Sequence, residues 1–175
     1  MHLFLAIAIA AWSKSRTFGK AAKARNLLER MKDLYEAGKL SAGPNTHCYT
    51  AVINSCAYCE NDSLEKRDAL KIALATYKEL ERTPECGGPN NVAYATMLTA
   101  LRNLLPPSDE RDAAAESIFK RCCATGQVDQ LVVRRLSSML NTQKLKHILS
   151  DSLVTSSGEV DTRQIPEKWR RNLKP

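Results

Sequence analysis

Cysteine is the residue type whose chemistry stands out first in this sequence, which contains six of them. Cys56 and Cys59 form a C-x-x-C pair, a spacing that can hold zinc when a second pair or histidine partners complete the site. Cys122 and Cys123 are adjacent, and no histidine follows at zinc-finger spacing. The pattern therefore favours buried free thiols in a reducing compartment, and we expect no metal and no other cofactor.

Residues typical of catalysis are scattered. The three histidines do not pair with a nucleophile, and the sequence has no Gly-rich phosphate loop and no H-E-x-x-H motif. No acidic cluster resembles that of a metal-dependent nuclease. We therefore expect a protein that is not an enzyme.

Charge points to a different class of function. Lysine and arginine outnumber aspartate and glutamate by 26 to 19, which gives a net charge of +7. Such an excess attracts phosphate backbones and anionic lipid surfaces. The apolar run 3–11 is too short to span a bilayer and lacks a basic leader, so we interpret it as part of the first helix of a repeat unit, with a signal segment as the alternative. We expect no membrane association.

An internal repeat organises the chain. Residues 43–53 and 88–98 lie 45 positions apart and share Gly, Pro, Asn and Tyr at matching places. Gly-Pro cannot continue a helix, whereas Asn45 and Asn90 can cap the next one. The apolar residues then recur at i, i+3, i+4 and i+7, which is one stripe of an α-helix. Their copies are Tyr49/Val52/Ile53/Cys56 and Tyr94/Met97/Leu98/Leu101.

A second helical element also recurs, with alanine at the start of each stripe. Its copies are Ala24/Leu27/Leu28/Met31, Ala73/Thr76/Tyr77/Leu80 and Ala115/Ile118/Phe119/Cys122. Neither helix can bury its stripe alone, so helix pairs must stack. The sequence predicts an all-α protein, an α-solenoid of stacked antiparallel helix hairpins. Its predicted units are 2–45, 46–90, 91–129 and a degenerate fourth, 130–149, followed by a polar linker and basic tail, 150–175.

These elements resemble the pentatricopeptide repeat family. The resemblance covers roughly 2–140 and rests on the Tyr-containing first helix, the Ala-led second helix and the Pro-Asn closing turn. The tail 165–172 is similar to a segment that closes some members. The units are longer than the family's usual 35 residues, and the extra residues are expected in loops around 36–43, 59–66 and 105–111. A tetratricopeptide-like protein-binding scaffold is the alternative, although its signature is absent.

The resemblance implies a sequence-selective binder of single-stranded RNA that reads one base per repeat. Carried over residue by residue, it pairs Thr50 with Asn90, Ala95 with Asp129 and Ala6 with Asn45 as the base-reading residues. The first of these pairs is the family's combination for adenine. The other candidates for RNA contact are Val52, Met97, Lys14, Arg134 and Arg135, and for the first two core packing is the favoured role.

The same resemblance implies organellar RNA processing, stability or translation, in a mitochondrion or a plastid, with the cytoplasm as the alternative. We expect a monomer that can join other proteins of an RNA-processing complex. The chain opens directly in a repeat without an Arg- and Ser-rich transit peptide, which suggests that an upstream portion is missing.

Overall fold

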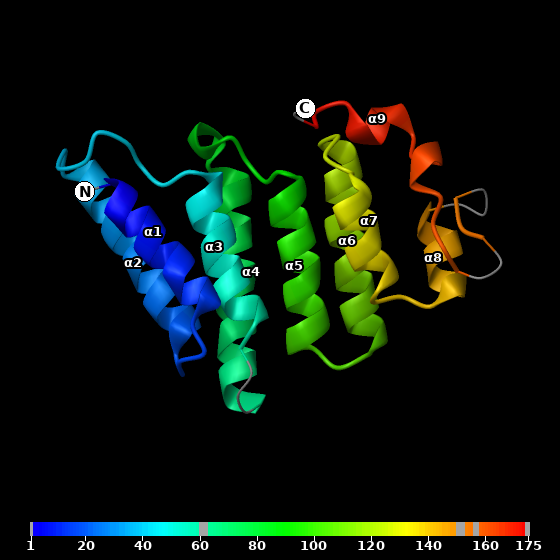
Figure 1. Cartoon of the computed structure of the whole chain (residues 1–175), viewed down its shortest axis with the longest axis horizontal. Helices are drawn as coiled ribbons and strands as arrows, with labels where there is room; N and C mark the ends of the chain where they lie inside the picture. Colours follow the sequence, from blue (N-terminus) through cyan, green and yellow to red (C-terminus); the bar gives the residue numbers. More distant parts are fainter. Residues whose placement is uncertain (1, 60–62, 150–152, 156–157, 174–175) are drawn as a thin grey trace. The chain divides into compact units, whose positions relative to one another are not determined.

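The computed structural model of the chain describes residues 2–59, 63–149, 153–155 and 158–173 (Figure 1). The elements in these ranges are helices and one isolated bridge, so the predicted all-α class is confirmed. The α-helices are α1 (His2–Lys14), α2 (Lys20–Glu36), α3 (Thr46–Ala57), α4 (Ser63–Arg82), α5 (Asn91–Leu104), α6 (Asp109–Ala124), α7 (Gln130–Ser137), α8 (Thr142–Leu149) and α9 (Glu167–Arg170). Short 3-10 turns occur at Pro84–Cys86 and Thr162–Gln164.

Two compact units divide the chain, Met1–Pro89 and Asn90–Pro175. The division falls inside the second Pro-Asn turn, where the helix-breaking proline ends one segment and the asparagine starts the next helix.

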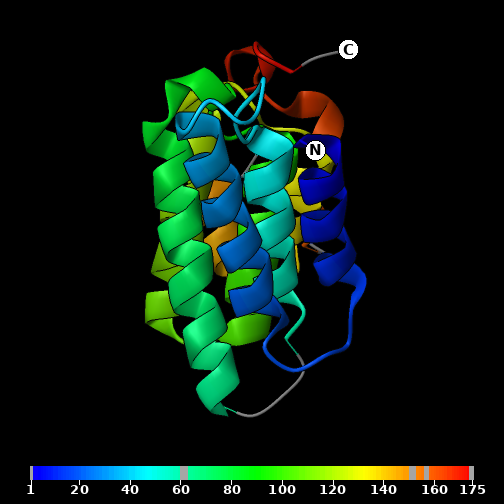
Figure 2. The same cartoon turned by 90° about the vertical axis from the view of Figure 1, so that its left-hand side faces the viewer.

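Unit 1 consists of α1 to α4. Consecutive helices run antiparallel and pack in pairs, α1 with α2 and α3 with α4, and α3 also packs against both helices of the first pair (Figure 2). The expected stripe of α3 is buried in full, from Tyr49 to Cys56. Leu28 and Met31 of α2 and Leu80 of α4 complete this core. The 3.6-residue periodicity therefore identified the inner faces correctly.

A polar network also links three helices of unit 1. The Tyr49 hydroxyl of α3 donates a hydrogen bond to Glu79 Oε1 of α4 at 3.2 Å. Arg25 and Lys32 of α2 form ion pairs with the same carboxylate at 2.6 and 2.7 Å. Burial opposes ionisation of Glu79, but the hydrogen bonds from Lys32 and Arg25 outweigh it and lower the pKa of this carboxyl.

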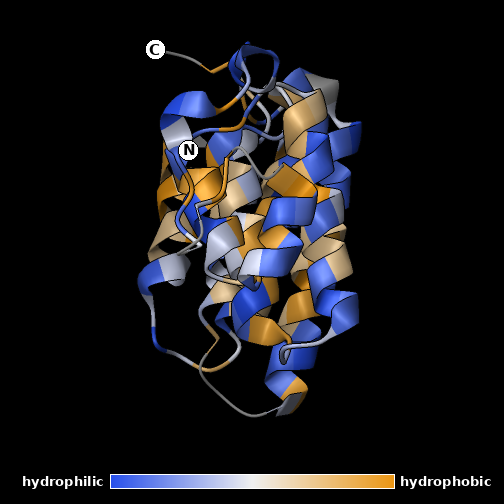
Figure 3. Ribbon diagram, turned by 90° about the vertical axis from the view of Figure 1, so that its right-hand side faces the viewer, coloured by the Kyte–Doolittle hydropathy of each residue, from blue (hydrophilic) through white to orange (hydrophobic). Residues whose placement is uncertain are grey.

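In unit 2, α5 packs against both α6 and α7. Tyr94, Met97, Leu98 and Leu101 of α5 are buried, as are the four stripe residues of α6. Figure 3 shows hydrophobic and hydrophilic residues alternating along the helices, as expected for amphipathic helices with one inner face. α7 and α8 lie within 130–149, the range in which a degenerate fourth unit is expected.

The end of the chain packs on unit 2, which differs from the polar linker and tail that the composition predicts for 150–175. Leu153, Val154 and Ile165 are buried. The Trp169 ring meets Phe119 of α6 edge-on, with 5.8 Å between ring centroids. Although its overall composition is polar, this segment contains enough apolar residues to pack against α6 and the rest of unit 2.

Backbone hydrogen bonds fix the same tail. The amide of Val128 donates to the carbonyl of Trp169 at 2.8 Å, and the amide of Asn172 donates to that of Gly126 at 3.0 Å. Gly126 has φ +67°, the left-handed conformation in which glycine commonly ends a helix. A Cβ at this position would lie 2.6 Å from Arg171 Cγ, so glycine also allows the tail to approach.

Two of the expected long loops are partly helical instead. α4 begins at Ser63 and α6 begins at Asp109, so residues expected in the loops 59–66 and 105–111 extend these helices. Ser108 explains the second case, because its hydroxyl caps α6 by accepting from the amide of Arg111 at 3.2 Å.

None of the helices in the described part of the chain combines the length and the apolar character that crossing a membrane requires. α1 is the most apolar of them by sequence, and it has 13 residues.

Candidate nucleic-acid interface

Three of the expected base-reading residues are helix N-caps. Asn45, Asn90 and Asp129 are the N-caps of α3, α5 and α7, with extended ψ values of 174°, 178° and −177°. In each, the side-chain Oδ1 accepts a hydrogen bond from the amide three residues later, at 3.2, 3.0 and 2.8 Å respectively. The cap satisfies one of the unpaired amides of the first turn.

The residue after a cap binds to the next closing turn in both units. In unit 1, Thr46 Oγ1 donates to the carbonyl of Gly88 at 3.0 Å. In unit 2, Asn91 Nδ2 donates to Asp129 Oδ2 at 2.6 Å, and the Asn91 amide donates to Gln127 Oε1 at 3.2 Å. Within each unit, therefore, two successive closing turns lie side by side at the N-terminal ends of the first helices.

The partners predicted for these caps are less accessible. Thr50 is 8% exposed, and its hydroxyl donates to the carbonyl of Thr46 at 2.7 Å. Ala95 is 2% exposed and carries no polar group, while Ala6 is half-buried on α1. Ala95 and Asp129 belong to unit 2, and Ala6 and Asn45 to unit 1, whereas Thr50 and Asn90 belong to different units.

Val52 and Met97 pack in the core, which is the role that the sequence favoured over RNA contact for both. Both side chains are fully buried, because they belong to the inner stripes of α3 and α5. The apolar and aromatic groups that are exposed beside the caps are Val92, 46% exposed, and His47. Each follows its cap by two residues and lies off the buried stripe, which is the sequence signal that could have identified them.

Basic side chains lie on the first helices. Lys14, at the end of α1, and Arg134 of α7 are exposed, and Arg135 is half-buried. Arg102 of α5 was not among the RNA-contact candidates identified from the sequence. Its guanidinium donates to Ser138 Oγ at 3.1 Å, which brings it from α5 to the end of α7. Unit 2 therefore places three arginines on its two first helices.

The cysteines of the C-x-x-C pair lie inside the core of unit 1. Cys56 and Cys59 are free and buried, and burial raises the pKa of both thiols. Among the residues that the structure describes, no group of three or more His, Cys, Asp and Glu side chains is placed to hold a metal ion.

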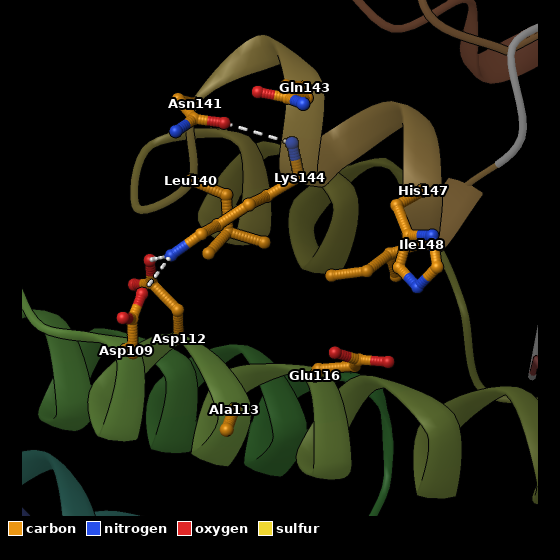
Figure 4. A pocket seen from close by; sticks show the side chains of 10 residues that line it. All are labelled: Asp109, Asp112, Ala113, Glu116, Leu140, Asn141, Gln143, Lys144, His147 and Ile148. Atoms are coloured by element: carbon orange, nitrogen blue, oxygen red, sulfur yellow. Dashed lines mark hydrogen bonds and ion pairs between the residues drawn. The ribbon is translucent and has the colours of Figure 1, made fainter.

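Unit 2 also contains a pocket of about 570 Å³ between α6 and α8 (Figure 4). Lys144 closes one end, with its Nζ 2.8 Å from Asp109 and 2.7 Å from Asp112. Glu116 and His147 face each other from opposite walls. Burial opposes ionisation of Asp112, but hydrogen bonds from Lys144 and Arg111 dominate and lower its pKa. These ion pairs hold α8 against α6.

No protein-family model, curated protein or solved structure matches this chain.

Proposed function

We propose that this chain binds single-stranded RNA as a pentatricopeptide-type repeat protein, in which the helix pairs stack as an α-solenoid. The observation that carries the proposal is the recurrence of one cap geometry. Asn45, Asn90 and Asp129 start three first helices with the same backbone conformation and the same hydrogen bond. A protein that reads one base per repeat needs such an equivalent polar group in each repeat.

Capping and base reading are compatible in the two asparagines. The cap uses one lone pair of Oδ1, whereas an asparagine side chain also has a second lone pair and two N–H donors. Both Asn45 and Asn90 are exposed, so these groups can reach the Watson–Crick edge of a base. Asp129 differs, because Asn91 and the helix amide each donate to one of its carboxylate oxygens.

The proposed base-reading pairs are those that the resemblance to pentatricopeptide repeats implies. Thr50 with Asn90 selects adenine, while Ala95 with Asp129 and Ala6 with Asn45 contribute less, since alanine offers no polar group. Val92 and His47 replace the two buried residues as candidates to stack against bases. The arginines of α5 and α7 and Lys14 of α1 would bind phosphates.

The proposed partners are single-stranded RNA and other proteins of an RNA-processing complex, in a mitochondrion or a plastid. The net charge of +7 supports the attraction to RNA, since the counterions that RNA releases favour binding to a basic surface.

The test is the salt dependence of RNA binding, measured by fluorescence anisotropy with short single-stranded oligonucleotides. We expect affinity to fall as salt rises, with a slope of about −0.7 per phosphate contact. Arg134→Ala with Arg135→Ala should weaken binding and make that slope shallower by up to about 1.4.

A matched control is Arg67→Ala with Arg82→Ala, which removes the same charge from exposed positions of α4, a second helix. If the two double variants weaken binding equally, binding reflects net charge alone. Absence of RNA binding together with tight peptide binding would instead support the tetratricopeptide-like scaffold.

A further inference from the structure

The docked tail, residues 165–173, lies on the closing turn that precedes α7. The carbonyl of Trp169 accepts a hydrogen bond from the Val128 amide at 2.8 Å, and Val128 is followed directly by the cap residue Asp129. Within unit 2, α9 lies at the end at which α5 and α7 begin (Figure 1). The tail is therefore a neighbour of the helix caps to which the proposed function assigns base reading.

Gln127 connects the docked tail to these caps. Its Nε2 donates to the carbonyl of Asn172 at 2.9 Å, and its Oε1 accepts from the amide of Asn91 at 3.2 Å. Asn91 follows the cap Asn90, and its own Nδ2 donates to Asp129 Oδ2 at 2.6 Å. One chain of hydrogen bonds therefore runs from the tail, through the closing turn, to the residues at which α5 and α7 start.

The docked tail and the residues just before it are basic. Basic residues outnumber acidic ones by four to one in 163–171. Arg171 serves the docking itself, because its guanidinium donates to the carbonyl of Ala124 at the end of α6. Lys168 and Arg170 have no such task. Both side chains are exposed, and within the described part of the chain no hydrogen bond or ion pair occupies them.

We propose that Lys168 and Arg170 bind the phosphate backbone of the RNA strand whose bases lie at the caps of unit 2. This inference rests on the proposed function and extends its site from the repeat helices to the tail. Contacts to bases give specificity, whereas contacts to phosphates position the strand and supply much of the affinity. Arginine and lysine both form charge-assisted hydrogen bonds with phosphate oxygens.

Docking is what distinguishes this role from that of a free basic arm. Trp169 lies between the two cations in the sequence and packs edge-on against Phe119 of α6. Its ring and the backbone bonds of the tail hold Lys168 and Arg170 in place before RNA arrives. Binding then avoids the entropic cost of ordering a mobile segment. A free arm would act through its charge alone and would keep its effect if the tail detached.

Fluorescence anisotropy of the whole chain with a short single-stranded oligonucleotide tests the phosphate contacts. Lys168→Ala with Arg170→Ala should weaken binding by about tenfold at ~0.1 M salt and make the salt slope shallower by up to about 1.4, since two phosphate contacts are lost. The matched control is Lys78→Ala with Arg82→Ala, which removes one lysine and one arginine from exposed positions of α4. This control should leave the slope nearly unchanged.

Trp169→Ala tests the docking at constant net charge. It removes the ring that packs on Phe119 and should weaken binding about as much as the double substitution in the tail, because the two cations lose their fixed place. Binding is measured well below the melting temperature of each variant, with circular dichroism as the check of folding. If Trp169→Ala does not fold, the double variant decides alone, since both of its substitutions are at exposed positions.

The outcomes separate this inference from the proposed function. A wild-type chain that binds no RNA would reject the proposed function. A wild-type chain that binds RNA, but is weakened equally by the tail and α4 double variants, would overturn the role of the tail alone. So would a folded Trp169→Ala variant with wild-type affinity and slope.

Discussion

Single polar residues at the helix starts serve the fold whether or not they also bind RNA. Asn90 caps α5 through Oδ1, and an aspartate could make the same hydrogen bond with the Ala93 amide. Its exposed amide group is the part that a base could recognise. A substitution that keeps the cap and changes this group therefore separates the two roles.

Asn90→Asp is expected to move the base preference from adenine towards guanine. The change removes the N–H donors and leaves an acceptor-only group, which the N1 and N2 hydrogens of guanine can satisfy. Discrimination should change by about 1–3 kcal/mol, or roughly ten- to a hundredfold. Binding of oligonucleotides that differ at one base measures this preference, and thermal unfolding should show nearly unchanged stability.

Asn26→Asp is the control, because it makes the same charge change at an exposed position of α2. It should weaken binding to all oligonucleotides alike. An identical ranking of the four bases for wild type and Asn90→Asp would show that Asn90 is only a helix cap.

In two of the helix pairs, α3 with α4 and α5 with α6, a tyrosine of the first helix forms a hydrogen bond with the second. Tyr49 donates to Glu79 of α4, whereas the Tyr94 hydroxyl accepts from Thr125 Oγ1, the C-cap residue of α6, at 3.1 Å. Glu79 has the additional ion pairs with Arg25 and Lys32, so one carboxylate connects α2, α3 and α4.

Glu79→Gln is expected to reduce the acid sensitivity of unit 1. The pKa of Glu79 in the folded chain lies below its ordinary value of 4.5, so the unfolded chain takes up this proton first as pH falls. The stabilisation is complete above pH 4.5 and is lost as pH falls through the lower folded pKa. The variant should lose about 1–2 kcal/mol at neutral pH and show a flatter pH dependence below that value.

Urea unfolding between neutral pH and about pH 3 measures both effects. Glu36→Gln removes an exposed carboxylate from the end of α2 and should change neither result. The same pH dependence in wild type and Glu79→Gln would mean that the ion pairs contribute nothing in solution.

At the scale of the whole molecule, each compact unit has its own core. Tyr49, Leu28 and Leu80 lie fully or almost fully inside unit 1, and Tyr94, Phe119 and Leu136 inside unit 2. We expect residues 1–89 and 90–175 to fold when produced separately, because a segment with its own apolar core can fold alone.

Circular dichroism of the two fragments should show helical spectra, and each should unfold cooperatively on heating. Trp169→Ala in the 90–175 fragment should lower its melting temperature, since this ring packs edge-on against Phe119. An unfolded fragment, obtained under conditions in which the whole chain is folded, would contradict the division into two units.

Local features were predictable from the sequence because their physics acts over a few residues. Stripes such as Tyr49/Val52/Ile53/Cys56 follow from the 3.6-residue period, and the Pro-Asn turns end one helix and cap the next. These signals identified the all-α class, the helix pairs and the caps. The same stripes include Val52 and Met97, which are buried as the periodicity predicts, whereas their candidacy for RNA contact came from the family resemblance alone.

Only the tertiary structure decided the contacts between residues distant in the chain. Glu79 is 30 residues from Tyr49 and 54 from Arg25, and no periodic pattern pairs them. Trp169 finds Phe119 although its segment reads as a polar tail. The burial of a side chain depends on which element covers it: Phe4 of α1 is exposed, whereas Cys48 of α3 is buried with its Sγ 4.0 Å from Met31 Sδ of α2.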